Sequence, residues 1–333
     1  MSTVSDGLYQ YGGVPVASDL VGTGKVFWVK PYSGDDNNTG KKPSQAFASL
    51  AQALSKCTAN KGDRVYLVAE SNTASSTTDY QSATLNWNKD GVHLIGVGAS
   101  PMIGSRARIG QLSTVKTVET LMKVSANNCL IANIEIFQGV ASSTATSPVA
   151  LEVTGQRNKF VNCQISGNGD TALSMDTAGA RSLLLNGAAE NEFINCYIGL
   201  DTSSRVTSVA EIEHKASAKR NILRDCIISS MSGASGFVFV KADAAAAAID
   251  RFEMYKNCAF LNPVNSTATT MTAAVVTHAS LGGHIVLFNP MIVGATDITA
   301  ADKSNVKVLG FTGAADASNE HKEMGLAKNV DVA

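Results

Sequence analysis

The sequence lacks the features that mark several large classes of protein. Lys and Arg number 27 against 28 Asp and Glu, so the net charge is −1, and only 17% of the 333 residues are charged. Binding to nucleic acid or to an anionic membrane surface needs clustered positive charge, so we expect neither partner. No run of about 18 apolar residues is present, which excludes a membrane-spanning helix. Residues 1–6 resemble no part of a secretory signal, so we expect none.

Cysteine is present but widely spaced, because six residues at 57, 129, 163, 196, 226 and 258 are never closer than 30 positions. Zinc sites use close pairs such as C-x-x-C, so this spacing predicts no thiolate metal site. No motif predicts a cofactor or a catalytic nucleophile either. A chain of this size does not need disulfides, so we expect reduced and buried thiols.

The last four cysteines reveal an internal repeat, since the steps between them are 33, 30 and 32 residues. Periods of about 20 to 50 residues are typical of solenoids. A strand-like segment, an Asn or Asp, a cysteine slot and another strand-like segment recur in six copies. The repeated positions are Asn133, Asn162, Asn195, Asp225, Asn257 and Asn289, with Cys163, Cys196, Cys226 and Cys258 in the next slot.

A tight corner between two strands explains the repeated Asn and Asp. Such a corner needs a left-handed backbone, which Asn and Asp tolerate better than other non-glycine residues. Repeats stacked at the strand spacing of about 4.8 Å would bring these side chains one above another in a hydrogen-bonded ladder. A further strand-like segment precedes each copy, and no amphipathic helix separates the strands. The pattern therefore predicts an all-β parallel β-helix, a solenoid with three strands per turn.

The open ends of a solenoid need caps. Ser44 can cap a helix over residues 45–57, whose apolar positions form one stripe at helical spacing. We therefore divide the chain into an N-terminal arm over 1–25, a β-helix with its capping helix over 26–311, and a C-terminal tail or cap over 312–333.

Glycine recurs along the arm, with a few apolar residues between the glycines. The arm is either a disordered terminus or an extended segment that docks on a neighbouring subunit or partner. A disordered tail that only kept the protein soluble would not need two tyrosines and a leucine, so we favour the docking of the arm on a neighbouring subunit or partner. The candidate anchoring residues are Leu8, Tyr9, Tyr11 and Val14.

Three stretches carry a family resemblance: VFWV at 26–29, DDNNTG at 35–40 and GDRVY at 62–66. With the Asn repeats, they resemble the pectate-lyase-like right-handed parallel β-helix proteins over most of residues 25–310. The resemblance implies a right-handed helix but no single activity, because the fold serves polysaccharide lyases, hydrolases, phage tailspikes and inert virion proteins. The opening SDGLYQYGGVPV at 5–16 is similar to uncharacterised phage structural proteins.

An enzyme acting on polysaccharides would need outward carboxylates grouped with a base. The outward column of the first strand instead alternates in sign, which favours exposed ion pairs between coils. Its members are Lys123, Glu152, Glu211 or Glu213, and Lys241. Glu213, His214 and Lys215, with His278 on a nearby coil, are a conceivable site, but a solvated turn is the preferred interpretation. We therefore predict no catalytic residue.

Two further acidic stretches are candidates of a weaker kind. The oxygens of Asp35, Asp36, Asn37 and Asn38 could hold calcium, but the bidentate Glu of an EF-hand loop is missing, and a polar turn is favoured. Asp170 and Asp176 stand among Gly, Ser and Thr, and we expect them to decorate a loop.

Two functions fit these observations. The first is a non-enzymatic bacteriophage virion protein, a capsid decoration or head spike made in the host cytoplasm and anchored through its arm to the major capsid protein or another virion protein. The second is a tailspike-like protein that binds or depolymerises a host glycan. The resemblance implies a homo-oligomer, with a trimer favoured. We expect Val161, Ile194 and Phe288 to form an outward apolar strip that suits burial against another subunit.

Overall fold

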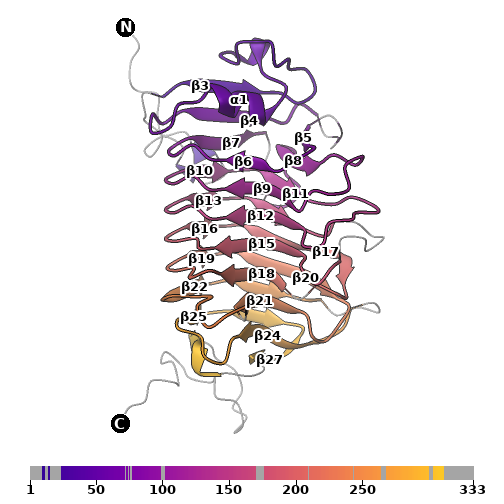
Figure 1. Cartoon of the computed structure of the whole chain (residues 1–333), viewed down its shortest axis with the longest axis vertical. Coiled ribbons are helices and arrows are strands. Elements are labelled where there is room, and N and C mark those ends of the chain that lie inside the picture. Colours follow the sequence, from indigo (N-terminus) through magenta and orange to yellow (C-terminus); the bar gives the residue numbers. More distant parts are fainter. Residues whose placement is uncertain are drawn as a thin grey trace.

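The computed structural model describes residues 24–310, apart from 72, 74, 76, 99–101, 170–175, 209, 243, 264–267 and 300–302. It also describes the backbone of two short strands, β1 (Gln10–Tyr11) and β2 (Val14–Pro15). The chain winds into an elongated parallel β-helix of about seven turns (Figure 1). The prediction of an all-β parallel β-helix is confirmed.

Three parallel sheets form the walls of the helix, and each turn passes from sheet III to sheet I and then to sheet II. Sheet I contains β3 (Val26–Val29), β4 (Arg64–Val68), β7 (His93–Val97), β10 (Leu130–Ala132), β13 (Lys159–Val161), β16 (Glu192–Ile194), β19 (Ile222–Arg224), β22 (Phe252–Lys256), β25 (His284–Phe288) and β28 (Val306–Leu309). Sheet II contains β5 (Thr78–Gln81), β8 (Arg108–Gln111), β11 (Glu135–Phe137), β14 (Gln164–Ser166), β17 (Tyr197–Arg205), β20 (Ile227–Ser232), β23 (Ala259–Leu261) and β26 (Met291–Val293). Sheet III contains β6 (Leu85–Trp87), β9 (Thr120–Val124), β12 (Val149–Val153), β15 (Arg181–Asn186), β18 (Ala210–Lys215), β21 (Val238–Ala242), β24 (Met271–Thr277) and β27 (Ala295–Thr299).

The core runs along the axis of the helix as columns of matched side chains. In sheet I, Phe160 pairs in register with Phe193, and their rings stack with centroids 4.4 Å apart. Leu223 and Tyr255 continue this column, and all four side chains are fully buried. Each buried side chain of this kind stabilises the fold by about 1.5 to 3 kcal/mol, but only when the neighbouring turn covers it.

The corner between sheets I and II has the left-handed backbone that the repeat predicts. Asn133, Asn162, Asn195, Asp225, Asn257 and Asn289 all have φ between 49° and 58°. Asn162 Nδ2 donates to Asn133 Oδ1 at 3.2 Å. Near the other end, Asn257 donates to Asp225 at 3.1 Å and Asn289 to Asn257 at 3.2 Å. The amides therefore link successive turns at the corner.

The residue after each corner points into the core. Cys163, Cys196, Cys226 and Cys258 are buried free thiols that stack in one column. The backbone N–H of Tyr197 donates to the Cys163 carbonyl, that of Ile227 to the Cys196 carbonyl, and that of Ala259 to the Cys226 carbonyl. The Cys196 Sγ also donates to the carbonyls of Ile194 at 3.4 Å and Phe160 at 3.6 Å. Burial raises the pKa of the Cys196 thiol, so it stays neutral.

Helix α1 (Leu50–Lys56) covers the N-terminal end of the core (Figure 1). The prediction that Ser44 caps a helix starting at 45 is wrong, because a short 3-10 helix, η1 (Pro43–Gln45), occupies that position. Ser49 is the cap, and its hydroxyl accepts from the Gln52 N–H at 3.2 Å. The carboxylate of Asp36 fixes this start by accepting from the Ala48 and Ser49 N–H groups, each at 2.9 Å.

The two ends of the chain are described only in part. In the arm, β1 and β2 form a hairpin in which Tyr11 pairs with Val14. Leu8 and Tyr9 lie outside the described residues, and so do residues 312–333. At the other end, a 3-10 helix, η3 (Lys303–Asn305), precedes the last strand, β28. None of the helices in the described part of the chain has the length and hydrophobicity that a membrane span requires.

Replacing Cys196 tests the stacked core. Cys196→Val keeps an apolar side chain of similar size and should lower the free energy of unfolding by less than about 1.5 kcal/mol. Cys196→Asp places an unpaired carboxyl in a fully buried site, which costs several times more. Thermal melting followed by circular dichroism measures both. Equal melting temperatures for the two variants would contradict the burial of this position.

Candidate functional site

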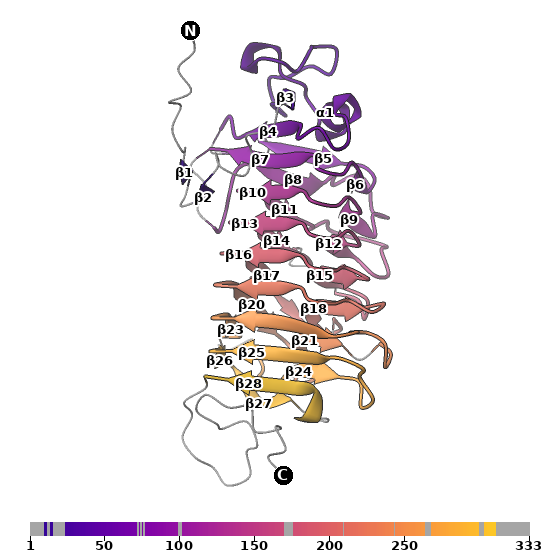
Figure 2. The same ribbon diagram turned by 90° about the vertical axis from the view of Figure 1, so that its left-hand side faces the viewer.

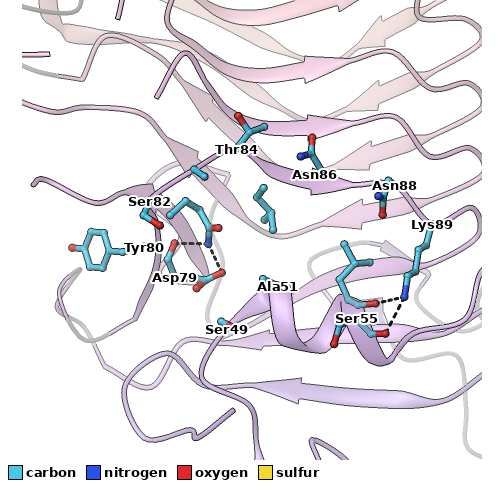
Figure 3. A pocket seen from close by; sticks show the side chains of 14 residues that line it. Ser49, Ala51, Ser55, Asp79, Tyr80, Ser82, Thr84, Asn86, Asn88 and Lys89 are labelled. Carbon is cyan, nitrogen blue, oxygen red and sulfur yellow. Dashed lines mark hydrogen bonds between the residues drawn. The ribbon is translucent and has the colours of Figure 1, made fainter. Parts of the chain in front are cut away.

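A groove lies between helix α1 and strands β5 and β6, at the N-terminal end of the β-helix (Figure 3). Its volume is about 500 Å³. The lining is rich in small polar side chains: Ser49, Ser55, Asp79, Tyr80, Gln81, Ser82, Thr84, Asn86, Asn88 and Lys89, with Ala51, Leu54, Ala83 and Leu85. Hydroxyls and amides both donate and accept hydrogen bonds, so the groove suits a neutral polar ligand.

Asp79 is the acidic group of this groove, and it is 5% exposed. Its Oδ2 accepts from the Leu50 N–H at 3.2 Å and from Gln81 Nε2 at 2.7 Å. Burial raises the pKa of Asp79 to about 7, and the nearby charge of Asp36 adds to the shift, while the two hydrogen bonds oppose it. The carboxyl is therefore partly protonated near neutral pH.

Lys89, the basic residue of the lining, is held by the end of helix α1. Its Nζ donates to the carbonyls of Leu54 at 2.7 Å, Ser55 at 3.0 Å and Cys57 at 2.7 Å. The Leu54 carbonyl also accepts from the Cys57 N–H at 3.1 Å. A cation at this C-terminal end of the helix interacts favourably with the helix dipole. Burial raises the pKa of the neighbouring Cys57 to about 12, so that thiol is not nucleophilic.

Tyr80 stands at one end of the groove and is 45% exposed. It also lines a second hollow of about 180 Å³ on the outer face of sheet II. In that hollow the Arg108 guanidinium lies 4.1 Å from the centre of the Phe137 ring and 3.2 Å from Glu135. An exposed aromatic ring between two polar hollows is a surface on which a flat ligand can stack.

The groove offers one buried carboxyl rather than the pair that glycoside hydrolysis needs. Within the described residues, no three His, Cys, Asp or Glu side chains gather closely enough to hold a metal ion. The arrangement can therefore bind a ligand through hydrogen bonds and stacking, and Asp79 is the one carboxyl among the residues that line the groove.

The expected solvated turn at Glu213, His214 and Lys215 is wrong, because these residues end the buried strand β18. His214 points into the core, where its Nε2 lies 2.8 Å from the Tyr255 hydroxyl and its Nδ1 lies 3.3 Å from Glu253. Burial raises the pKa of Glu253. His278 instead accepts a hydrogen bond from the Ser280 N–H. A polar cluster that resembled a surface site is thus part of the interior.

The alternating charges on the outward column of sheet III predict exposed ion pairs between turns. The structure contains such a pair, but other members of the column are buried. Lys123 and Glu152 do pair, at 3.3 Å. Glu213 is 2% exposed and pairs with Arg181 and Lys215. Glu211 lies in the same strand but is fully buried, because the long strand β17 brings Arg205 over it.

The carboxylate of Glu211 is fully occupied inside the fold. Arg205 donates to both of its oxygens, at 3.0 and 2.9 Å, and the hydroxyls of Ser182 and Ser230 donate at 2.6 and 2.7 Å. A buried pair with this many hydrogen bonds is costly to break from one side. Its role is to fasten the end of β17 to strands β15, β18 and β20.

A second ladder, which the sequence reasoning missed, lies at the corner that leads into sheet I. Asn191 Oδ1 accepts from the Asn158 N–H at 2.9 Å, and Asn221 Oδ1 accepts from the Asn191 N–H at 3.0 Å. Asn221 Nδ2 then donates to Glu253 at 3.0 Å. A signal was present, because residues 158, 191, 221 and 253 each stand five positions before a cysteine of the repeat.

The two weaker acidic candidates have structural roles. Asp36 caps the start of α1, and Asp35 accepts from the N–H and side-chain amide of Asn37, as in the polar turn that was favoured. Asp176 does not decorate the surface, because it is 7% exposed and accepts from the N–H groups of Val206, Thr207 and Ser208. Asp170 lies outside the described residues.

The predicted outward strip of Val161, Ile194 and Phe288 is not continuous. All three lie in one column of sheet I, but Arg224 and Lys256 stand between Ile194 and Phe288. Val161 is also only 5% exposed, whereas Phe288 is 39% exposed. The spacing of the Asn repeat aligned these positions correctly but did not reveal the charged residues that share their column.

No family model matches the sequence, and no curated protein matches it. Solved structures do. Pectate lyase Pel9A superposes with a TM-score of 0.58 at 13% identity, over 91% of this chain and 75% of that one. The pectin methylesterase from Aspergillus niger has a TM-score of 0.55 at 14% identity, over 92% and 91%. Pectin methylesterase PemA from Erwinia chrysanthemi has a TM-score of 0.53 at 14% identity, over 90% and 92%.

The chain has the pectate lyase-like parallel β-helix fold. The matches cover nearly the whole described β-helix, but at 13% and 14% sequence identity they show a shared fold alone. In this pectate lyase-like β-helix, function must therefore be argued from its own side chains.

The protonation of Asp79 predicts a pH dependence of stability. Its pKa is about 7 in the folded chain and about 4 in an unfolded one, so the folded chain binds more protons between these values. This contribution to the free energy of unfolding therefore falls as the pH rises from about 4 to about 7, and is constant above that. Asp79→Asn should remove it.

Urea unfolding of both proteins from pH 4 to 8 measures the effect as the difference between their free energies of unfolding. The exposed Asp250→Asn is the matched control and should show no such slope. A difference between wild type and Asp79→Asn that stays constant over this range would contradict the raised pKa of Asp79.

Proposed function

We propose that this protein is a non-enzymatic structural component of a bacteriophage particle, a capsid decoration or head-spike protein attached through its N-terminal arm. The observation that carries the proposal is that outward charged side chains form ion pairs with one another from turn to turn. The proposal includes a homotrimer, synthesis in the host cytoplasm and attachment to the major capsid protein or another virion protein.

The pairing is clearest beside sheet I. Glu192 lies 3.6 Å from Lys159 in the turn before it and 2.8 Å from Arg224 in the turn after it. Glu190 is bound in the same way between Arg157, at 2.8 Å, and Arg220. Each exposed pair contributes less than about 1 kcal/mol, but a continuous row fixes the register of successive turns. Charged side chains paired in this way favour a structural role for the β-helix, which we call the shaft, over a role in acid–base chemistry.

The arm supplies the second support. Residues 5–16 resemble uncharacterised phage structural proteins, and they precede β3, the first strand of the β-helix. A rigid rod with a distinct apolar segment at one end is suited to attachment by that segment while the rod projects away.

Locating the protein in a particle tests this proposal. Antibodies raised against the β-helix should label the head shell of purified phage particles in negative-stain electron microscopy, and removal of residues 1–23 should abolish incorporation. Incubation with polygalacturonate or pectin should release neither unsaturated products nor methanol. Labelling confined to the tail tip, or release of either product, would contradict the proposed function.

A second candidate function is glycan binding, and Tyr80 is the observation that favours it. Its half-exposed ring stands between the polar groove at α1 and the hollow at Arg108. Sugar rings are recognised by stacking on an aromatic face together with hydrogen bonds to hydroxyls and amides, and Thr84, Asn86 and Asn88 offer those along the groove.

Substitution of Tyr80 separates the two candidates. If the groove binds a glycan, Tyr80→Ala should weaken binding to an array of bacterial surface polysaccharides by about tenfold, since a stacking contact is worth about 1 kcal/mol or more. Tyr32→Ala removes another exposed tyrosine, 73% exposed, and is the matched control. Binding that survives Tyr80→Ala unchanged, or no binding by the parent protein, would remove this candidate.

A further inference from the structure

The outer face of sheet I carries a second hydrophobic cluster, separate from the core. Leu94, Ile131 and Phe160 of successive strands point into the core. The residue after each points outward: Ile95, Ala132 and Val161. These outward residues are in register with Trp28 and Tyr66 on one side and Ile194 on the other. We call these six residues, Trp28, Tyr66, Ile95, Ala132, Val161 and Ile194, the outer column.

The middle of the outer column is covered. Ile95 is 4% exposed, Ala132 2% and Val161 5%, although all three face away from the core. Phe288, farther along the same line of sheet I, is 39% exposed. Side chains on an uncovered sheet face stand in water, and apolar clusters outside a core lie beneath other segments of chain. Some segment therefore lies over the middle of the outer column.

The N-terminal hairpin is in the right place to be that segment. Figure 2 shows β1 and β2 at the level of the N-terminal half of the spiral, on the side where β7 and β10 are labelled. Ten residues, 16–25, separate this hairpin in the sequence from β3, which contributes Trp28, the first member of the outer column. The 23 residues before the continuously described chain can reach about 75 Å, whereas six stacked strands span about 24 Å.

The composition of residues 1–23 also fits an apolar face. This segment contains no Lys or Arg, and its acidic residues are Asp6 and Asp19. Gly12 and Gly13 stand in the sequence between the two paired strands, and Gly-Gly is a residue pair that tight antiparallel turns favour. Tyr11 and Val14 are register partners on either side of this connection.

We propose that residues 1–23 dock on the outer column of their own chain, with the β1–β2 hairpin over Ile95, Ala132 and Val161. The arm is then held against the shaft in the isolated protein, and a partner that takes the arm must compete with this surface. The inference concerns the isolated chain and does not depend on the phage assignment.

Thiol labelling tests the docking directly. The six native thiols are buried, so a cysteine introduced on the surface can be followed alone. Ala132→Cys should react with a maleimide about tenfold faster or more when residues 1–20 are deleted, because the covering segment is gone. Lys256→Cys, an exposed position in line with the outer column, is the matched control and should react equally fast in both chains.

Two outcomes would overturn the proposal. An equal labelling rate for Ala132→Cys in the full and the shortened chain would mean that another segment covers the outer column. Protection that falls on dilution, together with light scattering that shows a dimer or trimer dissociating, would place the arm of a second copy there. Protection that is independent of concentration in a monomer supports docking within one chain.

Changes within the arm guard against an indirect effect of deletion. In the full chain carrying Ala132→Cys, the double replacement Tyr11→Ser and Val14→Ser should raise the labelling rate as deletion does. Gln10→Ser, which changes a polar residue of the same hairpin, should leave the rate unchanged. Equal rates in all three chains would contradict docking through the hairpin.

Discussion

The structure depends on one constraint: each turn must lie on the last with like side chains in register. A single turn of three short strands cannot bury its own apolar side chains, so its stability comes from the turns on either side. The column from Phe160 through Tyr255 is an example, since each ring or aliphatic group is covered by its counterpart in the next turn. A change in register at one turn would misalign every inward position of that turn at once.

The same constraint governs the polar residues. Amides stack as ladders at two corners, Glu253 ends one of these ladders, and Glu192 holds cations of the turns before and after it. Buried polar groups are tolerated only when they are hydrogen-bonded, and a repeating structure supplies the partner from the neighbouring turn. Repeated charged and amide residues in this chain therefore indicate the stacking of turns rather than a reactive site.

Distinctive surfaces arise where the repeat is interrupted. At the N-terminal end, helix α1 stands in for a strand, and the mismatch between α1 and the strands β5 and β6 leaves the groove that contains Asp79. On sheet I, the charged positions Arg224 and Lys256 limit the apolar outer column to the N-terminal half of the shaft. Binding by this protein is thus expected at its end and along one face, on a shaft that is otherwise regular.

The repeat was enough to predict the fold, because a period of about 30 residues with Asn or Asp at each corner leaves few architectures that can bury its apolar positions. It also predicted that the cysteines of the repeat are buried. Which polar residues are buried depends instead on tertiary contacts. Glu211, His214 and Asp176 look like surface residues in the sequence, but β17, Tyr255 and a backbone loop pack against them. The groove at Asp79 was equally hidden, since its walls come from segments about 30 residues apart. Local patterns report contacts that repeat along the chain, whereas these contacts occur once and depend on how distant segments meet.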